Sequence, residues 1–449
     1  MTYTALENKN GFLSLADKLI WLIIYAMLSV ALVVNSSLLL SAAVVASLTY
    51  VLFAKIERVF PLICGLSMFE TVFGIQGNSM WFLLLLIFCA KALLKSEMRI
   101  KAFAFFSCLI VACLELLSDF DTTSIGQLVS NISCIIFIFC AFSNANNWKI
   151  RAFDILFSIS CAFFGVISYI LFMEGGVAKY IASFMEASYV YRFGHEYGDT
   201  VGGAMAIPLY ASQIIAVAIS FLLLAKNKTL IHKLFTIAII ALALISGAMT
   251  ISRSFYLCAL ISLALFVLLR NQSGTVGKIA IPTAVVCFFI AMFYLESDIA
   301  NKVFASLQIR WDAGMEEGTA GRMDIWRSCF SYLYNNPWRL LFGSGATNYP
   351  QIGEQLGVYF SAGAHNFILD LLMSWGLVGT VLVVCVCITG MRDVIKKIEN
   401  IHYHSFVPFF CFFAFSMTAL RCNSMKALIF MLMTFVIVNG LNAEGNNDT

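Results

Sequence analysis

Residues 366–390 read NFILDLLMSWGLVGTVLVVCVCITG, a stretch that is apolar over almost its whole length. A helix that spans the hydrocarbon core of a membrane needs about 20 mostly apolar residues, so this stretch is long enough to cross. The rest of the chain has the same character: 61% of its 449 residues are hydrophobic, 12% are charged, and the mean hydropathy is +0.89. Soluble domains carry about 25% charged residues, because a surface in water needs polar groups. The sequence therefore predicts an all-α polytopic membrane protein.

Apolar runs of similar length recur along the chain and predict about fourteen spanning helices. The run at 59–73 is the weakest, because it is short and contains Pro61, Gly65 and Glu70; it is a candidate for a re-entrant or interfacial segment. The count falls to twelve if two short neighbouring runs do not cross separately, so we expect about 12–14 transmembrane helices. The runs lie at 18–34, 37–54, 59–73, 79–95, 102–118, 124–145, 152–173, 203–225, 234–250, 255–270, 279–295, 366–390, 405–421 and 425–442.

Lysine and arginine gather in alternate loops between these runs. Positively charged short loops mark the cytoplasmic side of a membrane protein, so we expect these loops and both chain termini to be cytoplasmic. The opposite, outer side then receives two longer loops, 174–202 and 296–365. We divide the chain into an N-terminal transmembrane bundle, 1–233, and a C-terminal transmembrane part, 234–449, with one outer loop in each. The cytoplasmic groups are Lys55 and Arg58; Lys95, Arg99 and Lys101; Lys149 and Arg151; Lys226, Lys228 and Lys233; Arg270 and Lys278; and Arg392, Lys396 and Lys397.

The second outer loop is too long for a simple turn. Within it, Trp326, Phe330 and Leu333 have helical spacing, and Pro337 marks a stop. We therefore expect short amphipathic helices in this loop, lying at the membrane surface.

Arg253 lies in Ile251-Ser252-Arg253-Ser254, between two apolar runs. One interpretation is structural: Arg253 would anchor the cytoplasmic end of a helix. The predicted topology argues against it, because it places Arg253 on the outer side. Charges at membrane depth are costly and often functional, so we expect Arg253 to meet an anion.

The loop from Gly321 to His365 holds further polar residues. Arginine binds phosphate oxygens with a two-pronged guanidinium group, so Arg322 and Arg327 are candidates for a pyrophosphate site. The Gly343/Gly345 pair would let the backbone approach a ligand, although glycine in a loop is more often a turn. His365 and Asn366 begin a spanning helix, and an interfacial histidine that hydrogen-bonds a headgroup is the alternative reading of His365.

In this order, the motifs resemble the O-antigen polymerase and ligase superfamily, the Wzy- and WaaL-type enzymes. The resemblance covers roughly residues 234–390. The matching stretches are Ser252-Arg253-Ser254; Gly321-Arg322-x-x-Ile325-Trp326; Phe342-Gly343-Ser344-Gly345-x-x-Asn348-Tyr349; and Ala364-His365-Asn366 followed by Trp375-Gly376-Leu377-Val378-Gly379.

The resemblance implies a metal-independent glycosyltransferase of the bacterial inner membrane, with a site that faces the periplasm and no cofactor. The donor would be an oligosaccharide linked to undecaprenyl pyrophosphate. Arg253 and Arg322 would bind the pyrophosphate, and His365 would position or deprotonate the acceptor hydroxyl. Membrane lipid and a chain-length co-polymerase are the other expected partners; the net charge of +3 gives no reason to expect nucleic acid. The further candidate substrate-binding residues are Arg192, Arg310, Arg327, Trp326, Gly343, Gly345 and Asn366.

Two subfamilies remain open at this point. Family polymerases carry an arginine followed after ten residues by a glycine in each of two large outer loops. Here Arg192 pairs with Gly203 and Arg310 pairs with Gly321, although both loops are rich in glycine, and Arg192 could equally be held by a glutamate or an aromatic ring. Two substantial outer loops suit two bulky lipid-linked substrates, so we favour an O-antigen polymerase over an O-antigen ligase, which transfers the glycan to lipid A–core.

A flippase or transporter of lipid-linked saccharides is the alternative from another class. Such a protein would predict inverted repeats and broken helices in both halves. Only one interrupted segment is visible, near Pro61, and charge collects in the outer loops. The ionisable residues within apolar runs are Glu70, Lys91, Glu115 and Asp154.

Overall fold

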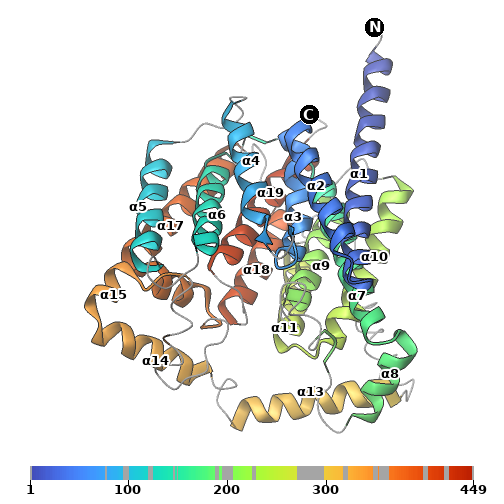
Figure 1. Cartoon of the computed structure of the whole chain (residues 1–449). Coiled ribbons are helices and arrows are strands. Elements are labelled where there is room, and N and C mark those ends of the chain that lie inside the picture. The colour runs from blue at the N-terminus through green and yellow to red at the C-terminus, as the bar shows by residue number, and fades with distance from the viewer. Residues whose placement is uncertain are drawn as a thin grey trace.

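Apolar helices form the body of the molecule (Figure 1). The computed structural model describes residues 3–446 apart from 76–77, 95–100, 120–124, 145–146, 149, 188–191, 195–205, 225–228, 270–297, 317–321, 347–351, 353–363, 398–402 and 419–423. The expected span at 279–295 lies outside the described residues. The helices of the body are α1 (Tyr3–Val33), α2 (Ser37–Phe53), α3 (Ile56–Leu66), α4 (Trp81–Leu94), α5 (Ala102–Asp119), α6 (Ile125–Asn144), α7 (Ala152–Met173), α9 (Ala206–Leu224), α10 (Leu230–Met249), α11 (Arg253–Leu269), α17 (Phe367–Lys397), α18 (Val407–Thr418) and α19 (Ser424–Asn446).

The prediction of an all-α polytopic membrane protein is confirmed. Within the described residues, five helices are long and apolar enough to cross a membrane, and six shorter apolar helices accompany them. Apart from the runs at 59–73 and 279–295, the expected runs coincide with helices, because lipid offers the backbone no hydrogen bonds and each spanning segment must satisfy its own. The five longer segments are Leu15–Val33, Ala152–Met173, Ile207–Leu224, Leu230–Met249 and Phe367–Lys396.

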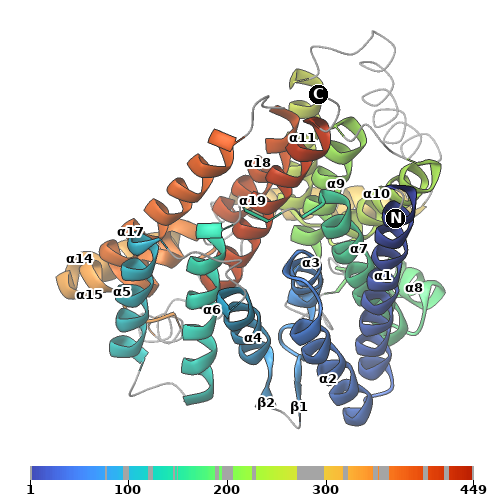
Figure 2. The same ribbon diagram turned by 90° about the horizontal axis from the view of Figure 1, so that it is seen from above.

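The weak run at 59–73 does not form one continuous helix. α3 has 11 residues, about 16 Å at 1.5 Å per residue, which is roughly half of the hydrocarbon core. A 3-10 turn, η1 (Ser67–Phe69), and a two-stranded antiparallel pair, β1 (Gly74–Ile75) with β2 (Asn78–Ser79), follow it. Figure 2 shows this pair between α3 and α4. The short helix and the turn favour the re-entrant alternative for this segment.

Side chains of neighbouring helices hold α3. The Ser158 hydroxyl donates to the Pro61 carbonyl at 2.6 Å, and the Tyr25 hydroxyl donates to the Leu62 carbonyl at 3.1 Å. All of these groups are buried. Irregular backbone at membrane depth is tolerated where protein groups satisfy it, and here α1 and α7 supply them.

Two of the charges within apolar runs are used inside the protein. Lys91 is buried, and its ammonium donates to the carbonyls of Val51, at 2.7 Å, and Ala54, at the C-terminal end of α2, where a cation is favoured by the helix dipole. Asp154 pairs with Lys18 at 3.0 Å. These residues are therefore accounted for by packing between helices.

Short helices cross one end of the molecule. The two long loops contain α8 (Val177–Glu186), α13 (Asp298–Glu316), α14 (Arg322–Asn335) and α15 (Pro337–Phe342), which confirms the expected short helices in the second loop. Figure 1 shows α8, α13 and α14 along the end opposite to the chain termini. On α14, Cys329 and Leu333 face inward, whereas Phe330 is 58% exposed. Phe330 therefore belongs to the outer face of this amphipathic helix.

Candidate active site

α14 is fixed to the residue that precedes His365. The indole N–H of Trp326 donates to the Ala364 carbonyl at 2.8 Å. A small apolar cluster, against which Trp326 packs, joins α14 to the first turns of α17. Its buried members are Cys329, Leu333, Ile352, Ala364, Leu369 and Met373. Trp326, which the sequence marks as a candidate for substrate binding, thus has a clear role in holding α14 against α17.

His365 has a left-handed backbone conformation, with φ at +56°. This region is uncommon for residues other than glycine and costs of order 1–3 kcal/mol unless the surroundings impose it. The surroundings do so on both sides. The Ala364 N–H donates to Asp370 Oδ1 at 2.8 Å, and Asn366 Oδ1 accepts the N–H groups of Ile368 and Leu369 at 3.1 and 3.2 Å. Asn366 is thereby the N-cap of α17.

Strained backbone that is imposed by its surroundings is a feature of functional sites. His365 is half-buried, at the junction between α14 and α17. Asp370, which is 1% exposed, was not singled out from the sequence. The available signal was a carboxylate six residues after Ala364 within an apolar run, where it must find donors.

The segment Gly343–Ala346 packs against a break in α17. Gly376 interrupts that helix with φ at +63°. The N–H groups of Ser344 and Gly345 donate to the carbonyls of Met373 and Ser374 at 2.8 and 2.9 Å. A Cβ atom at Gly343, where φ is +80°, would overlap the Ser374 carbonyl.

Close approach of backbone to backbone therefore explains the glycine at position 343. At position 345 a positive φ of +87° favours glycine in the same way. Both glycines therefore have a structural role in seating this segment on α17.

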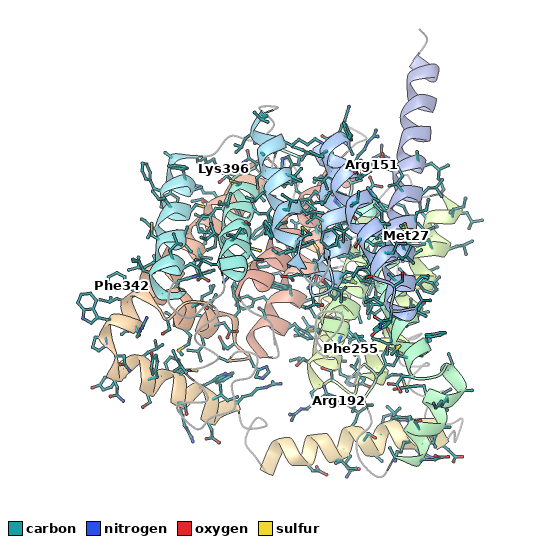
Figure 3. All side chains as sticks on the ribbon, viewed as in Figure 1. Met27, Arg151, Arg192, Phe255, Phe342 and Lys396 are labelled. Carbon is teal, nitrogen blue, oxygen red and sulfur yellow. The ribbon has the colours of Figure 1, made fainter. Side chains whose placement is uncertain are left out.

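A second group of residues surrounds the turn between α10 and α11. Arg253 is the first residue of α11 and is half-buried. The Phe193 N–H donates to the Met249 carbonyl at 3.0 Å, and Arg192 Nε donates to the Thr250 carbonyl at 3.4 Å. Figure 3 shows Arg192 between Phe255 and α13. The arginine of the first long loop thus lies at the turn that precedes Arg253.

α8 and α13 cover this turn. Phe184 of α8, Ile251 of the turn and Val303 of α13 form one buried cluster. The Lys302 ammonium donates to the Ala187 carbonyl at 2.5 Å. Segments of both long loops therefore pack on the turn that leads into Arg253.

The remaining predicted site residues have different surroundings. Arg322 begins α14 and is half-buried. Arg327 is exposed and makes a weak 3.5 Å pair with Asp324, a type of contact that contributes little. Arg310 belongs to α13. Gly203 and Gly321, which complete the two arginine–glycine pairs, lie outside the described residues.

The structure brings the two groups of residues to the same end of the molecule on different elements (Figure 1). One group is built on α14, α15 and α17, and the other on the α10–α11 turn with α8 and α13. In the part of the chain that the structure describes, no three His, Cys, Asp or Glu residues gather as a metal site would require.

Comparison with known proteins identifies one region of similarity. Residues 202–384 match the family model described as O-antigen ligase. A search of curated proteins finds no match. The matched region contains Arg253, Arg322 and His365, whereas Arg192 precedes it.

Proposed function

We propose that this chain, whose residues 202–384 match the family model described as O-antigen ligase, is an O-antigen polymerase of the O-antigen polymerase/ligase superfamily. It would join oligosaccharide repeat units, carried on undecaprenyl pyrophosphate, into a polysaccharide. The observation that carries the proposal is the start of α17. There, Asp370 and Asn366 hold His365 in a strained conformation, at the same end of the molecule as the turn that bears Arg253.

The proposed reaction transfers a glycan to a hydroxyl group. The acceptor hydroxyl oxygen attacks the anomeric carbon of the donor sugar, and the bond from that carbon to the pyrophosphate oxygen breaks. The electron pair leaves with undecaprenyl pyrophosphate, and the hydroxyl proton passes to His365. An imidazole with an ordinary pKa can accept a proton near neutral pH.

In this proposal the arginines carry the electrostatic part of catalysis. Arg253 and Arg322 hold the diphosphate through their guanidinium groups and stabilise the charge that develops on it as the bond breaks. This assignment leaves no step that needs a metal ion. Arg192 adds positive charge beside the Arg253 turn, and Arg310 and Arg327 are further candidates on α13 and α14. Trp326, Asn366, Gly343 and Gly345 remain candidates for substrate binding and also fix the geometry of the site.

The polymerase is favoured over a ligase by the position of Arg192. A polymerase must hold two lipid-linked glycans, and the first long loop brings its arginine to the turn that begins α11. The ligase is the second candidate, because the matching family model carries that description.

We further propose that the site faces the periplasm and that the protein lies in the bacterial inner membrane with both termini in the cytoplasm. The bias of Lys and Arg toward one set of loops supports this orientation. The position of the chain ends opposite α13 and α14 also supports it (Figure 1).

One gel tests the proposed activity. Lipopolysaccharide from cells that lack the gene should show lipid A–core capped by a single repeat unit. Core alone, with long glycan retained on undecaprenyl pyrophosphate, would identify a ligase instead. Complementation with Arg253→Ala, Arg322→Ala or His365→Ala should not restore the polymer at normal membrane levels of the protein. Arg392→Ala, an exposed change at the far end of α17, is the matched control and should restore it.

A further inference from the structure

A fully buried carboxylate from the first half of the chain contacts the segment that seats the site. Glu115 of α5 is 0% exposed. Its Oε2 accepts the indole N–H of Trp375 at 2.7 Å and the backbone N–H of Ala346 at 3.2 Å. Its Oε1 accepts the side-chain amide of Asn131, on α6, at 2.6 Å. One side chain thus receives donors from α6, α17 and the segment Gly343–Ala346.

The buried carboxylate of Glu115 and its buried N–H donors depend on each other for hydrogen bonds. A buried carboxylate is costly unless hydrogen bonds replace its water, and a buried N–H group without an acceptor is costly as well. Hydrogen bonds to a charged acceptor are among the stronger ones in proteins. Removal of the acceptor would therefore release the Trp375 and Ala346 donors together.

The donors Ala346 and Trp375 belong to the two segments that pack together, Gly343–Ala346 and α17. Ala346 follows Ser344 and Gly345, which bond to the backbone of Met373 and Ser374. Trp375 precedes Gly376, where α17 breaks. Glu115 therefore connects the segment Gly343–Ala346 to the first turns of α17, which begin directly after His365 and Asn366.

We propose that Glu115 is a positioning residue of the site: as a hydrogen-bond acceptor it fixes the start of α17, and through it His365. Its effect on catalysis rests on the proposed function, whereas its effect on geometry does not. The inference places a determinant of the site outside residues 202–384, in the part of the chain for which the sequence indicates only a series of spans.

Two substitutions at position 115 distinguish a requirement for the hydrogen-bond acceptor from a requirement for the negative charge. Glu115→Leu keeps much of the volume and removes the acceptor. Glu115→Gln removes the charge, but its carbonyl can still accept from Trp375 and Ala346 while the Asn131 amide turns over to accept from the new amide. A positioning role predicts that the Gln variant is largely preserved and the Leu variant is not.

The geometric readout is the reactivity of position 344. Ser344 is 1% exposed, so a thiol introduced by Ser344→Cys should react slowly with a maleimide in the purified protein, as quantified by peptide mass spectrometry. Adding Glu115→Leu should raise that rate about tenfold or more, the loss expected for hydrogen bonds to a charged group. Adding Glu115→Gln should keep it within about threefold of the Ser344→Cys parent. Asp312→Asn, which changes an exposed carboxylate on α13, is the control and should leave the rate unchanged.

Glycan polymerisation by the single variants supplies the second readout. Activity should fall about tenfold or more in Glu115→Leu and be mostly retained in Glu115→Gln. Unchanged reactivity at position 344 in Glu115→Leu would overturn the positioning role. So would a Gln variant that is inactive with parental reactivity at position 344, because the charge itself would then be required. If Glu115→Leu does not accumulate, Trp375→Phe removes one donor and should give a smaller rise in reactivity; no rise would overturn the proposal. Absence of polymerisation in the unmodified protein would refute the proposed function, and the labelling rates would still decide this inference.

Discussion

Trp326 and Ala364 are joined by a 2.8 Å hydrogen bond from the indole N–H to the backbone carbonyl. The bond links α14, which begins at Arg322, to the residue before His365. Two of the three proposed catalytic residues are therefore connected through one short path of protein groups. Any change that loosens α14 should alter the position of Arg322 relative to His365.

Trp326→Phe tests this connection directly. The ring can still fill its place, but the hydrogen bond is lost, so the rate of polymer formation should fall roughly three- to tenfold at an unchanged amount of protein. Initial rates in membranes measure the effect. Trp338→Phe serves as the control, because Trp338 on α15 is 73% exposed. Equal rates in the Trp326 variant and the parent would contradict the connection.

His365→Asn tests whether the side chain of this residue is needed as a proton acceptor, while its backbone conformation is kept. Asparagine also tolerates positive φ, so the protein should reach the membrane in normal amount. An amide cannot act as a general base at neutral pH, and such a base contributes about 100-fold or more, so polymer should be absent from the lipopolysaccharide gel. Substantial polymer in this variant would remove His365 from catalysis.

Arg322→Lys asks whether the two-pronged guanidinium group is needed. Lysine keeps the positive charge but binds a phosphate as a point charge, so we expect polymer formation to be lost. The amount of polymer on the gel is again the measurement. Arg392→Lys should behave like the parent, and a fully active Arg322→Lys variant would show that charge alone suffices.

Gly376→Ala tests the break in α17. Gly376 has φ +63° and ψ −168°, a conformation that is almost restricted to glycine and costs other residues of order 1–3 kcal/mol. The new Cβ atom would also overlap the backbone of Leu341 and Phe342. The thermal unfolding midpoint in detergent should therefore fall, together with activity. Gly126→Ala on α6 is the matched control, because nothing lies within 4 Å of a Cβ added there. A midpoint equal to that of the parent would show that the break can be accommodated elsewhere.

The proposed orientation can be tested with reporter fusions. A reporter that is active only in the periplasm should be active after residue 317 and inactive after Lys397. The expectation follows from the Lys and Arg bias of the loops. The opposite pair of results would place the site in the cytoplasm, where a periplasmic polymerase could not act.

Hydropathy predicted most of the fold because lipid leaves the backbone little choice other than helices. It did not determine which helices are neighbours. Glu115 was visible as an ionisable residue within an apolar run, but its partner Trp375 lies 260 residues further along the chain, and apolar periodicity does not specify such a pairing.

The candidate site was predicted in a similar, partial way. Arg253 and His365 could be found because each is polar at the end of an apolar run. The role of the glycine at 343 could not, because a glycine that meets a ligand and one that meets another backbone have the same sequence signature. The short α3 was anticipated from the short, weak apolar run at 59–73, although Pro61 lies inside the helix and does not end it.

The hydrogen-bond acceptor that Glu115 supplies limits which regions of this protein can be exchanged in a chimera. If residues 202–384 were transplanted into a different membrane scaffold, the indole of Trp375 and the amide of Ala346 would arrive without the oxygen they bond here. A chimera would need a host helix that delivers a carboxylate or amide oxygen at that depth. We therefore expect that exchange of glycan specificity between relatives requires α5 to be transferred together with the C-terminal region.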